Sequence, residues 1–244
     1  MLVTITTPCM NSEKTIARTI ESVLAQSYEN IEYIIKDGGS TDETLNIARS
    51  YERRFREKGY SLKIISNKDF GLYDAINIAT RQSTGFLVGN INSDDYYEKD
   101  AVKIMVDEYA SNPYDVAWGD IIVKTNRGEF RKKAKIGEWV WSTSGFCHPA
   151  MFVRRELLVE HPYLNKSMVD DFEFATWALT RKKRMRVVNK VVAVFNFGGM
   201  STKKSIKEVA RRVDLVYAVY QEYGFSKLYY VQRWLYELMK YVVS

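Results

Sequence analysis

Cysteine is scarce in this sequence, because its 244 residues contain only Cys9 and Cys147. Two cysteines in a chain of this length provide no disulfide framework, so we expect both to be reduced core residues. The sequence also lacks a continuous apolar run of about 18 residues and a cleavable N-terminal signal pattern. These absences predict a cytoplasmic globular protein, for which 46% hydrophobic and 27% charged residues are ordinary proportions.

Signatures of several nucleotide-binding and nucleic-acid-binding folds are also absent. No G-x-G-x-x-G fingerprint or Walker loop occurs, and residues 6–12 contain no Lys or Arg with which a nucleotidyltransferase would grip phosphates. The net charge is +6, but no nucleic-acid recognition motif accompanies it. We therefore expect no nucleic-acid partner and assign the positive charge to phosphorylated ligands.

The first half of the chain alternates between strand and helix patterns. Strands are predicted at residues 2–7, 31–36, 62–66 and 86–91, and helices at 12–26, 42–58, 73–82 and 97–109. This alternation is typical of βαβ units, so we expect an α/β fold with a mostly parallel central sheet flanked by helices. Farther on, residues 116–125 and 128–133 predict a β-hairpin.

Two adjacent carboxylates, Asp94 and Asp95, follow the apolar residues 86–88, which are typical of a buried strand. Mg²⁺ and Mn²⁺ prefer oxygen ligands, and one or two carboxylates leave coordination positions open for substrate phosphates. A divalent metal site is therefore one interpretation of this pair. The alternative is that Ser93 or Asp94 caps the helix predicted at 97–109.

A second polar segment follows the strand predicted at 31–36, where Asp37 precedes Gly38 and Gly39. The glycines allow a sharp turn and a close approach of the backbone to a ligand. Open α/β sheets bind nucleotides beyond the carboxyl ends of their strands. Asp37 is therefore a candidate nucleotide-binding residue.

Five motifs occur in a characteristic order. They are Thr6-Thr7-Pro8 with Asn11, Asp37-Gly38-Gly39-Ser40-Thr41-Asp42, Gly71 to Asn77, Asn92-Ser93-Asp94-Asp95, and Asp170-Asp171-Phe172-Glu173. In this order they resemble family 2 glycosyltransferases of the GT-A fold, in particular bacterial polysaccharide-assembly enzymes of the colanic acid type. The resemblance covers about residues 1–202 and implies a nucleotide-binding half at about 1–112 and an acceptor and catalytic half at about 113–202. Residues 203–244 carry no such motif, and we expect a helical C-terminal extension there.

On the donor side, the resemblance implies a set of residues around the nucleotide base. Asp37 would accept a hydrogen bond from the base, in a geometry that suits uracil or thymine. The base would lie near Thr7, Pro8 and Asn11.

The resemblance also assigns roles around the sugar and the diphosphate. Asp94 would reach the ribose, and Asp95 would bind a Mn²⁺ or Mg²⁺ ion that bridges the diphosphate. Asp74 and Asn77 would line the donor pocket. The alternative for Asp74 and Asn77 is a pair of polar residues at the start of a helix.

On the acceptor side, Asp171 matches the general base of the family. It would remove a proton from an acceptor hydroxyl, which attacks the anomeric carbon from the face opposite the diphosphate and inverts its configuration. Asp170 and Glu173 flank this residue. The alternative is that the three acids form a charged first helical turn, which the helix dipole favours.

Two further segments resemble parts of the family site. His148 would line the reaction cleft, or it would be a structural histidine. Gly199 and Ser201 belong to a segment similar to a loop that closes over the donor, in which glycines supply hinge freedom. Lys203 or Lys204 beside this segment would touch the diphosphate. The alternative is that both lysines are solvated surface residues.

The resemblance implies an inverting, metal-dependent enzyme that moves a sugar from a nucleotide donor, a UDP-sugar, to a saccharide or lipid-linked saccharide. Two alternatives stay open on the residues alone. One is a catalytically inactive module that binds sugar or nucleotide, and the other is a nucleotidyltransferase that shares the sheet and the metal site.

The C-terminal segment is both basic and aromatic, with eight Lys or Arg and four acids between Lys203 and Lys240. Its helical periodicity places apolar residues on one stripe and aromatic and basic residues on a neighbouring face. The stripe contains Leu228, Val231, Leu235, Leu238 and Val242, and the neighbouring face contains Lys227, Tyr230, Arg233, Trp234, Lys240 and Tyr241. This pattern predicts peripheral contact with an anionic membrane. The alternative is packing against the catalytic domain or in a homodimer.

Overall fold

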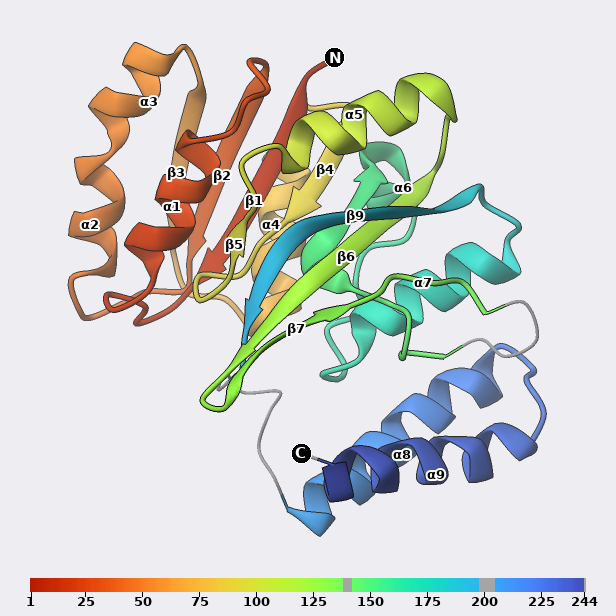
Figure 1. Cartoon of the computed structure of the whole chain (residues 1–244). Coiled ribbons are helices and arrows are strands. Elements are labelled where there is room, and N and C mark those ends of the chain that lie inside the picture. The colour runs from red at the N-terminus through yellow and green to blue at the C-terminus, as the bar shows by residue number, and fades with distance from the viewer. Residues whose placement is uncertain (138–141, 198–204, 244) are drawn as a thin grey trace.

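The computed structural model describes residues 1–137, 142–197 and 205–243. Its centre is a single mixed sheet in which the strands follow the order β3-β2-β1-β4-β8-β6-β9-β5, with β7 paired to β6 (Figure 1). This arrangement confirms the predicted α/β fold with a central sheet flanked by helices. Among the described residues, no helix is both long enough and apolar enough to cross a membrane.

The first half of the chain forms a parallel sheet with helical crossovers. Its strands are β1 (Val3–Cys9), β2 (Ile31–Asp37), β3 (Ser61–Ser66) and β4 (Leu87–Asn90), and its helices are α1 (Ile16–Leu24), α2 (Thr44–Ser50), α3 (Glu52–Lys58) and α4 (Leu72–Gln82). β1 pairs in parallel with both β2 and β4, and β2 pairs in parallel with β3. The carboxyl ends of these strands therefore meet at one edge of the sheet.

The rest of the chain adds strands that form mostly antiparallel pairs, and the helices that pack on them. Its strands are β5 (Tyr96–Tyr97), β6 (Val116–Thr125), β7 (Gly128–Lys132), β8 (Met151–Arg154) and β9 (Met185–Asn196). Its helices are α5 (Ala101–Ser111), the 3₁₀ turn His148–Ala150, α6 (Arg155–Glu160), α7 (Asp170–Thr180), α8 (Ile206–Glu222) and α9 (Leu228–Val243). β8 joins the two halves because it pairs antiparallel with both β4 and β6.

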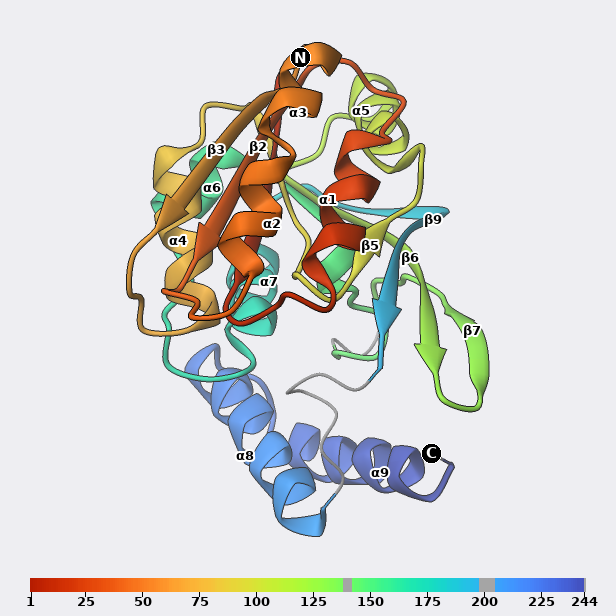
Figure 2. The same cartoon turned by 90° about the vertical axis from the view of Figure 1, so that its left-hand side faces the viewer.

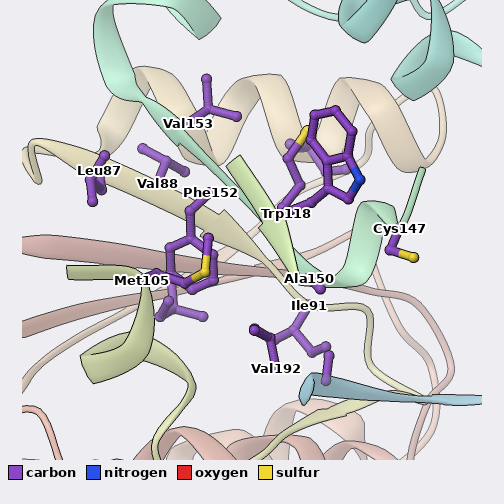
Figure 3. Close-up of a cluster of buried hydrophobic side chains, with 14 of the residues drawn as sticks. Leu87, Val88, Ile91, Met105, Trp118, Cys147, Ala150, Phe152, Val153 and Val192 are labelled. Carbon is purple, nitrogen blue, oxygen red and sulfur yellow. The ribbon is translucent and has the colours of Figure 1, made fainter. Parts of the chain in front are cut away.

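Helices cover the sheet on both faces, with α1 and α5 on one side and α4 and α6 on the other (Figure 2). Every residue of β1 is buried, as expected for a parallel strand that is covered on both faces. Apolar side chains of β4, β6 and β8 continue this core, in which Phe152 and Trp118 lie among aliphatic neighbours (Figure 3). Cys9 and Cys147 are buried free thiols, which confirms their expected role in the core.

The structure tests three of the elements that were predicted from the sequence pattern. The hairpin is confirmed, since Thr125 pairs with Gly128 at its tip. The helix predicted at 42–58 is divided at Tyr51 into α2 and α3. The helix predicted at 97–109 is wrong at its start, because Tyr96 and Tyr97 form a strand with β9 and α5 begins only at Ala101.

The C-terminal helices α8 and α9 pack against each other below the sheet in the view of Figure 1. The described part of the predicted stripe is exposed on α9, where Leu228 is 75% and Leu235 is 59% exposed, while the side chains of Lys240, Tyr241 and Val242 lie outside the described part. Arg233 was predicted on a membrane-facing surface, and this is wrong. It is only 4% exposed, forms an ion pair with Glu237 on α9, and donates a hydrogen bond to Thr143 of the sheet domain.

Candidate active site

The carboxyl ends of β1, β2, β3 and β4 bring the predicted donor-side motifs to one edge of the sheet. Cys9 lies opposite Asp37 in the register of β1 and β2, and Asp37 lies opposite Ser66 of β3. On the other side of β1, Thr6 lies opposite Asn90, just before the carboxylate pair. Residues separated by more than 50 positions in the sequence therefore share one edge.

Asp37 is fully buried at the end of β2, where its carboxylate organises the following turn. It accepts hydrogen bonds from the backbone N–H of Gly39 (3.0 Å), from the N–H and hydroxyl of Ser40, and from the hydroxyl of Ser66 (2.8 Å). Burial alone would raise the pKa of this carboxyl, but these donors outweigh burial and lower the pKa. Asp37 is therefore a charged group held in a fixed orientation at the donor edge.

The loop after β1 is tied to the turn that Asp37 organises. Asn11 has a positive φ of 48°, a conformation that asparagine tolerates better than most residues. Its backbone N–H donates to the Ser40 hydroxyl, and its side-chain oxygen accepts a 2.9 Å hydrogen bond from the N–H of Thr41. Thr7 and Pro8 are buried within β1, and the hydroxyl of Thr7 accepts a hydrogen bond from Tyr33.

A buried ion pair beside Asp37 is missing from the sequence-based site. The ammonium group of Lys36 is fully buried and donates to Asp69 and to the carbonyls of Asp37 and Asn67, each at 2.7 Å. Asp69 also accepts a hydrogen bond from the N–H of Gly71, just before α4. A lysine directly after the apolar residues Ile34 and Ile35 of a predicted buried strand is a signal that could have indicated this ion pair.

The carboxylate pair follows β4 and does not cap a helix. Helix α5 starts at Ala101 after Asp100, so the alternative in which Ser93 or Asp94 caps it is wrong. Asp95 is fully buried, and within the described part of the chain its Oδ2 atom has no hydrogen-bond partner. Burial, and secondarily the charge of Asp94, raise the pKa of Asp95 to about 8.

Asn196, the last residue of β9, holds the carboxylate pair and is also missing from the sequence-based site. Its backbone N–H donates to Oδ1 of Asp95 at 2.8 Å, and its side-chain amide donates to the carbonyl of Asp94 at 2.6 Å. Arg18 of α1 donates to the same Asp94 carbonyl at 2.8 Å. No motif marks Asn196, because it meets the pair only through the pairing of β9 with β5.

The residues around Asp95 fit a divalent cation. A buried carboxylate oxygen without a donor is costly when charged, and a bound cation would supply the missing partner. Among the described residues, no group of three or more His, Cys, Asp or Glu could enclose a metal. This is consistent with a cation that is held by one or two carboxylates and completed by substrate phosphates and water.

Asp74 and Asn77 lie on the first turns of α4 and have partners within the protein. Asp74 accepts a 3.0 Å hydrogen bond from the N–H of Phe70, in the loop that precedes the helix. The amide of Asn77 bonds to both the N–H (3.0 Å) and the carbonyl (2.7 Å) of Tyr163. Both contacts stabilise the junction between α4 and its surroundings, while the donor-binding role of the two residues stays a prediction.

The three acids at the start of α7 have different environments. Asp170 is buried and accepts hydrogen bonds from the backbone N–H groups of Lys166 and Ser167, so it stabilises the turn before the helix. Glu173 is buried and accepts hydrogen bonds from His161 and Tyr223. All three acids lie in the first turn of α7, as the alternative expected, but their side chains have different partners.

Asp171 alone among these acids has a partly exposed side chain, which is 21% exposed. Its Oδ1 accepts hydrogen bonds from the hydroxyl of Tyr73 (3.0 Å) and the N–H of Phe172 (2.8 Å). Its Oδ2 lies 3.8 Å from Nδ1 of His148, whose Nε2 is 3.2 Å from the hydroxyl of Tyr163. The structure thus brings the predicted residues Asp171 and His148 together.

Burial lowers the pKa of His148, and the nearby Asp171 only partly opposes this effect. Burial therefore favours the neutral form of the imidazole. Tyr73 and Tyr163 were not singled out from the sequence, although Tyr73 lies in the Gly71 to Asn77 motif. The remaining predicted residues Gly199, Ser201 and Lys203 lie outside the described residues.

Comparison with known proteins adds information on the family. The sequence model described as Glycosyl transferase family 2 matches residues 4–161. A relative from Mycobacterium tuberculosis, described as a PGL/p-HBAD biosynthesis glycosyltransferase, is 29% identical over 216 residues. That alignment covers 85% of this chain and 82% of the relative.

Two solved structures have the same fold. TarS of S. aureus in complex with UDP-GlcNAc superposes with a TM-score of 0.74 at 21% identity, over 98% of this chain and 72% of the TarS chain. A mannosyltransferase from Pyrobaculum calidifontis in complex with GDP-Man and Mn²⁺ has a TM-score of 0.69 at 18% identity. This second alignment covers 90% of this chain and 63% of the mannosyltransferase chain.

Proposed function

The chain belongs to glycosyl transferase family 2 and is a glycosyltransferase of glycan synthesis, and on that premise we propose its donor, its acceptor and its chemistry. It transfers a sugar from a UDP-sugar to a saccharide or lipid-linked saccharide, with a divalent cation and inversion at the anomeric carbon. The observation that carries this proposal is the buried Oδ2 of Asp95 at the sheet edge, which has no hydrogen-bond partner among the residues that the structure describes.

Asp95 would hold a Mn²⁺ or Mg²⁺ ion, and Asp94 would reach the ribose. When bound, the cation neutralises the charge that builds on the departing diphosphate. Asn196 and Arg18 keep the pair in place from two different elements, β9 and α1. The P. calidifontis enzyme solved with GDP-Man and Mn²⁺ supports a metal-dependent donor site in this fold.

The donor base would lie against the turn that Asp37 organises. A carboxylate has about four acceptor positions, and the donors from Gly39, Ser40 and Ser66 already use them. A nucleobase N–H that donates to Asp37 would therefore replace the hydrogen bond from one of the two serine hydroxyls. The TarS complex with UDP-GlcNAc supports a uridine nucleotide as the donor to test first.

Asp171 would act as the general base. As the acceptor oxygen forms its bond to the anomeric carbon, its proton passes to the Asp171 carboxylate. The bond between the anomeric carbon and the diphosphate oxygen breaks with its electron pair on the leaving diphosphate. The partial exposure of Asp171, in contrast to the buried Asp170 and Glu173, supports this assignment.

The acceptor would reach the enzyme at a membrane surface, with the protein peripheral on its cytoplasmic face. The exposed stripe of α9 would lie on the lipid, since Leu228, Val231, Leu235 and Leu238 are each at least 40% exposed. Lys227 beside the stripe is exposed and would face the headgroups. A second copy of the chain on the same stripe is the alternative that the membrane experiment must separate.

Thermal denaturation with a panel of nucleotide sugars tests the donor assignment. We expect UDP and one UDP-sugar to raise the melting temperature only when Mn²⁺ or Mg²⁺ is present, because ligand at about 100 times its Kd adds about 2.7 kcal/mol. The Asp95→Asn variant should lose this metal-dependent shift. If no nucleotide stabilises the protein with either cation, the proposed donor site is wrong.

A further inference from the structure

Helix α4 connects the donor edge of the sheet to the acid proposed as the base. Tyr73 and Asn77 lie four residues apart on this helix and therefore on the same face. Tyr73 contacts Asp171, and Asn77 holds the backbone of Tyr163 at both its N–H and its carbonyl. The loop before α4 is fixed by the buried Lys36–Asp69 ion pair.

The two oxygens of Asp171 have unlike surroundings. Oδ1 accepts from the Tyr73 hydroxyl at 3.0 Å and from the Phe172 N–H at 2.8 Å. Oδ2 accepts no hydrogen bond within the described residues, and its distance of 3.8 Å to Nδ1 of His148 is too long for one. Only Oδ2 therefore has its lone pairs available.

We propose that Tyr73 is a positioning residue for glycosyl transfer: its hydroxyl fixes Oδ1 of Asp171 so that Oδ2 faces the acceptor and receives its proton. This inference rests on the proposed role of Asp171 as the base. Tyr73 itself does not touch the reacting atoms and acts only through Asp171.

The surroundings of Tyr73 favour a protonated hydroxyl that acts as a hydrogen-bond donor. Burial, together with the charge of Asp171, raises the pKa of Tyr73 well above its ordinary value. The hydroxyl thus keeps its proton as a hydrogen-bond donor, with Oδ1 of Asp171 at 3.0 Å as its nearer acceptor and the carbonyl of Met168 at 3.3 Å as the other. The Tyr73 ring also packs on Tyr163, with ring centroids 5.1 Å apart, so the hydroxyl has little freedom to turn away.

The variant Tyr73→Phe removes only the hydroxyl. The matched control is Tyr97→Phe, which removes another buried tyrosine hydroxyl, one without a hydrogen-bond partner in the described part of the chain. We expect kcat of Tyr73→Phe to fall about ten- to a hundredfold, as a hydrogen bond to a charged group would predict. The KM for the donor and the affinity for UDP with Mn²⁺ should stay within about threefold of the control.

A double-mutant cycle separates positioning from a general structural effect. If Tyr73 acts through Asp171, then Tyr73→Phe should cause no further loss of rate in an Asp171→Asn background. Equal kcat for Tyr73→Phe and Tyr97→Phe would overturn the inference, and so would an equal loss in both backgrounds. Failure of the wild-type protein to bind UDP or to transfer sugar is a different result, which overturns the proposed function.

Discussion

The backbone N–H of Asn196 donates a 2.8 Å hydrogen bond to Oδ1 of Asp95, although 101 positions separate the two residues. The side chain of Asn196 adds a second contact, to the carbonyl of Asp94. One end of β9 therefore fixes the carboxylate pair from the acceptor half of the chain. This arrangement leaves Oδ2 of Asp95 without a hydrogen-bond partner among the described residues.

The first prediction concerns Asn196. Replacing it by alanine should weaken metal-dependent UDP binding roughly two- to tenfold, because the Asp94 carbonyl loses one donor and the pair becomes less fixed. Isothermal titration calorimetry with UDP and Mn²⁺ measures this change. The control is Asn189→Ala, an exposed residue of the same strand. Equal affinities for the two variants would contradict the role assigned to Asn196.

The second prediction concerns pH. The pKa of Asp95 is about 8 in the folded protein and about 4 in the unfolded chain, so the folded state retains this proton more strongly. Its contribution to stability is complete below pH 4 and is lost as pH rises to about 8. Without metal, the melting temperature of the wild type should therefore fall relative to Asp95→Asn as pH rises from 5 to 8.

The loss of wild-type stability relative to Asp95→Asn should reach on the order of 1 kcal/mol or more, which corresponds to a change of about 2–4 °C in melting temperature for a chain of this size. Addition of Mn²⁺ with UDP should reverse this loss, because a cation binds the deprotonated carboxylate and releases the proton. If the melting temperatures of the wild type and of Asp95→Asn change in parallel between pH 5 and 8, Asp95 does not have the raised pKa.

The third prediction distinguishes the adjacent acids Asp170 and Asp171. Asp171→Asn should lower the transfer rate about 10²- to 10⁴-fold and leave UDP binding unchanged, since a general base is lost. Asp170→Asn should instead lower the melting temperature, because the buried carboxylate that accepts hydrogen bonds from Lys166 and Ser167 is weakened. Initial rates and thermal denaturation of both variants provide the comparison. A near-normal rate for Asp171→Asn would exclude it as the base.

Local pattern predicted much of the donor half correctly. The alternation of apolar runs and helical faces gave the parallel strands β1 to β4. Strands β1, β2 and β4 are buried almost throughout, whereas β3 at the end of the sheet has only exposed and half-buried residues. The order of Asp37, Asp94 and Asp95 after these strands then placed all three at one edge. These inferences depend only on residues that are close in sequence to the strand that positions them.

Contacts between distant segments could not be predicted in this way. The helix predicted at 97–109 overlooked β5, because Tyr96 and Tyr97 pair with residues of β9 almost 100 positions away. Asn196 was missed for the same reason. Arg233 was placed on an exposed face of α9 because helical periodicity shows which residues share a face of the helix. It does not show which of these faces is buried. The domain boundary near residue 202 stays a prediction.

The last prediction concerns α9. Its polar side is turned inward, where Arg233 and Glu237 are at most 4% exposed, and its apolar stripe is turned outward. Binding to vesicles should therefore depend mainly on the stripe and only weakly on salt, since burying a leucine side chain is worth about 1.5–3 kcal/mol. Leu235→Glu should reduce co-sedimentation with anionic vesicles at least tenfold.

The control Ala218→Glu places the same acid on the exposed side of α8 and should bind vesicles like the wild type. Transfer to a water-soluble acceptor should be equal in all three proteins, because no described side chain of α9 contacts the donor edge. Analytical ultracentrifugation separates the remaining alternative. A wild-type dimer that Leu235→Glu converts to a monomer, together with negligible vesicle binding by both, would assign the stripe to a second copy of the chain instead of a membrane.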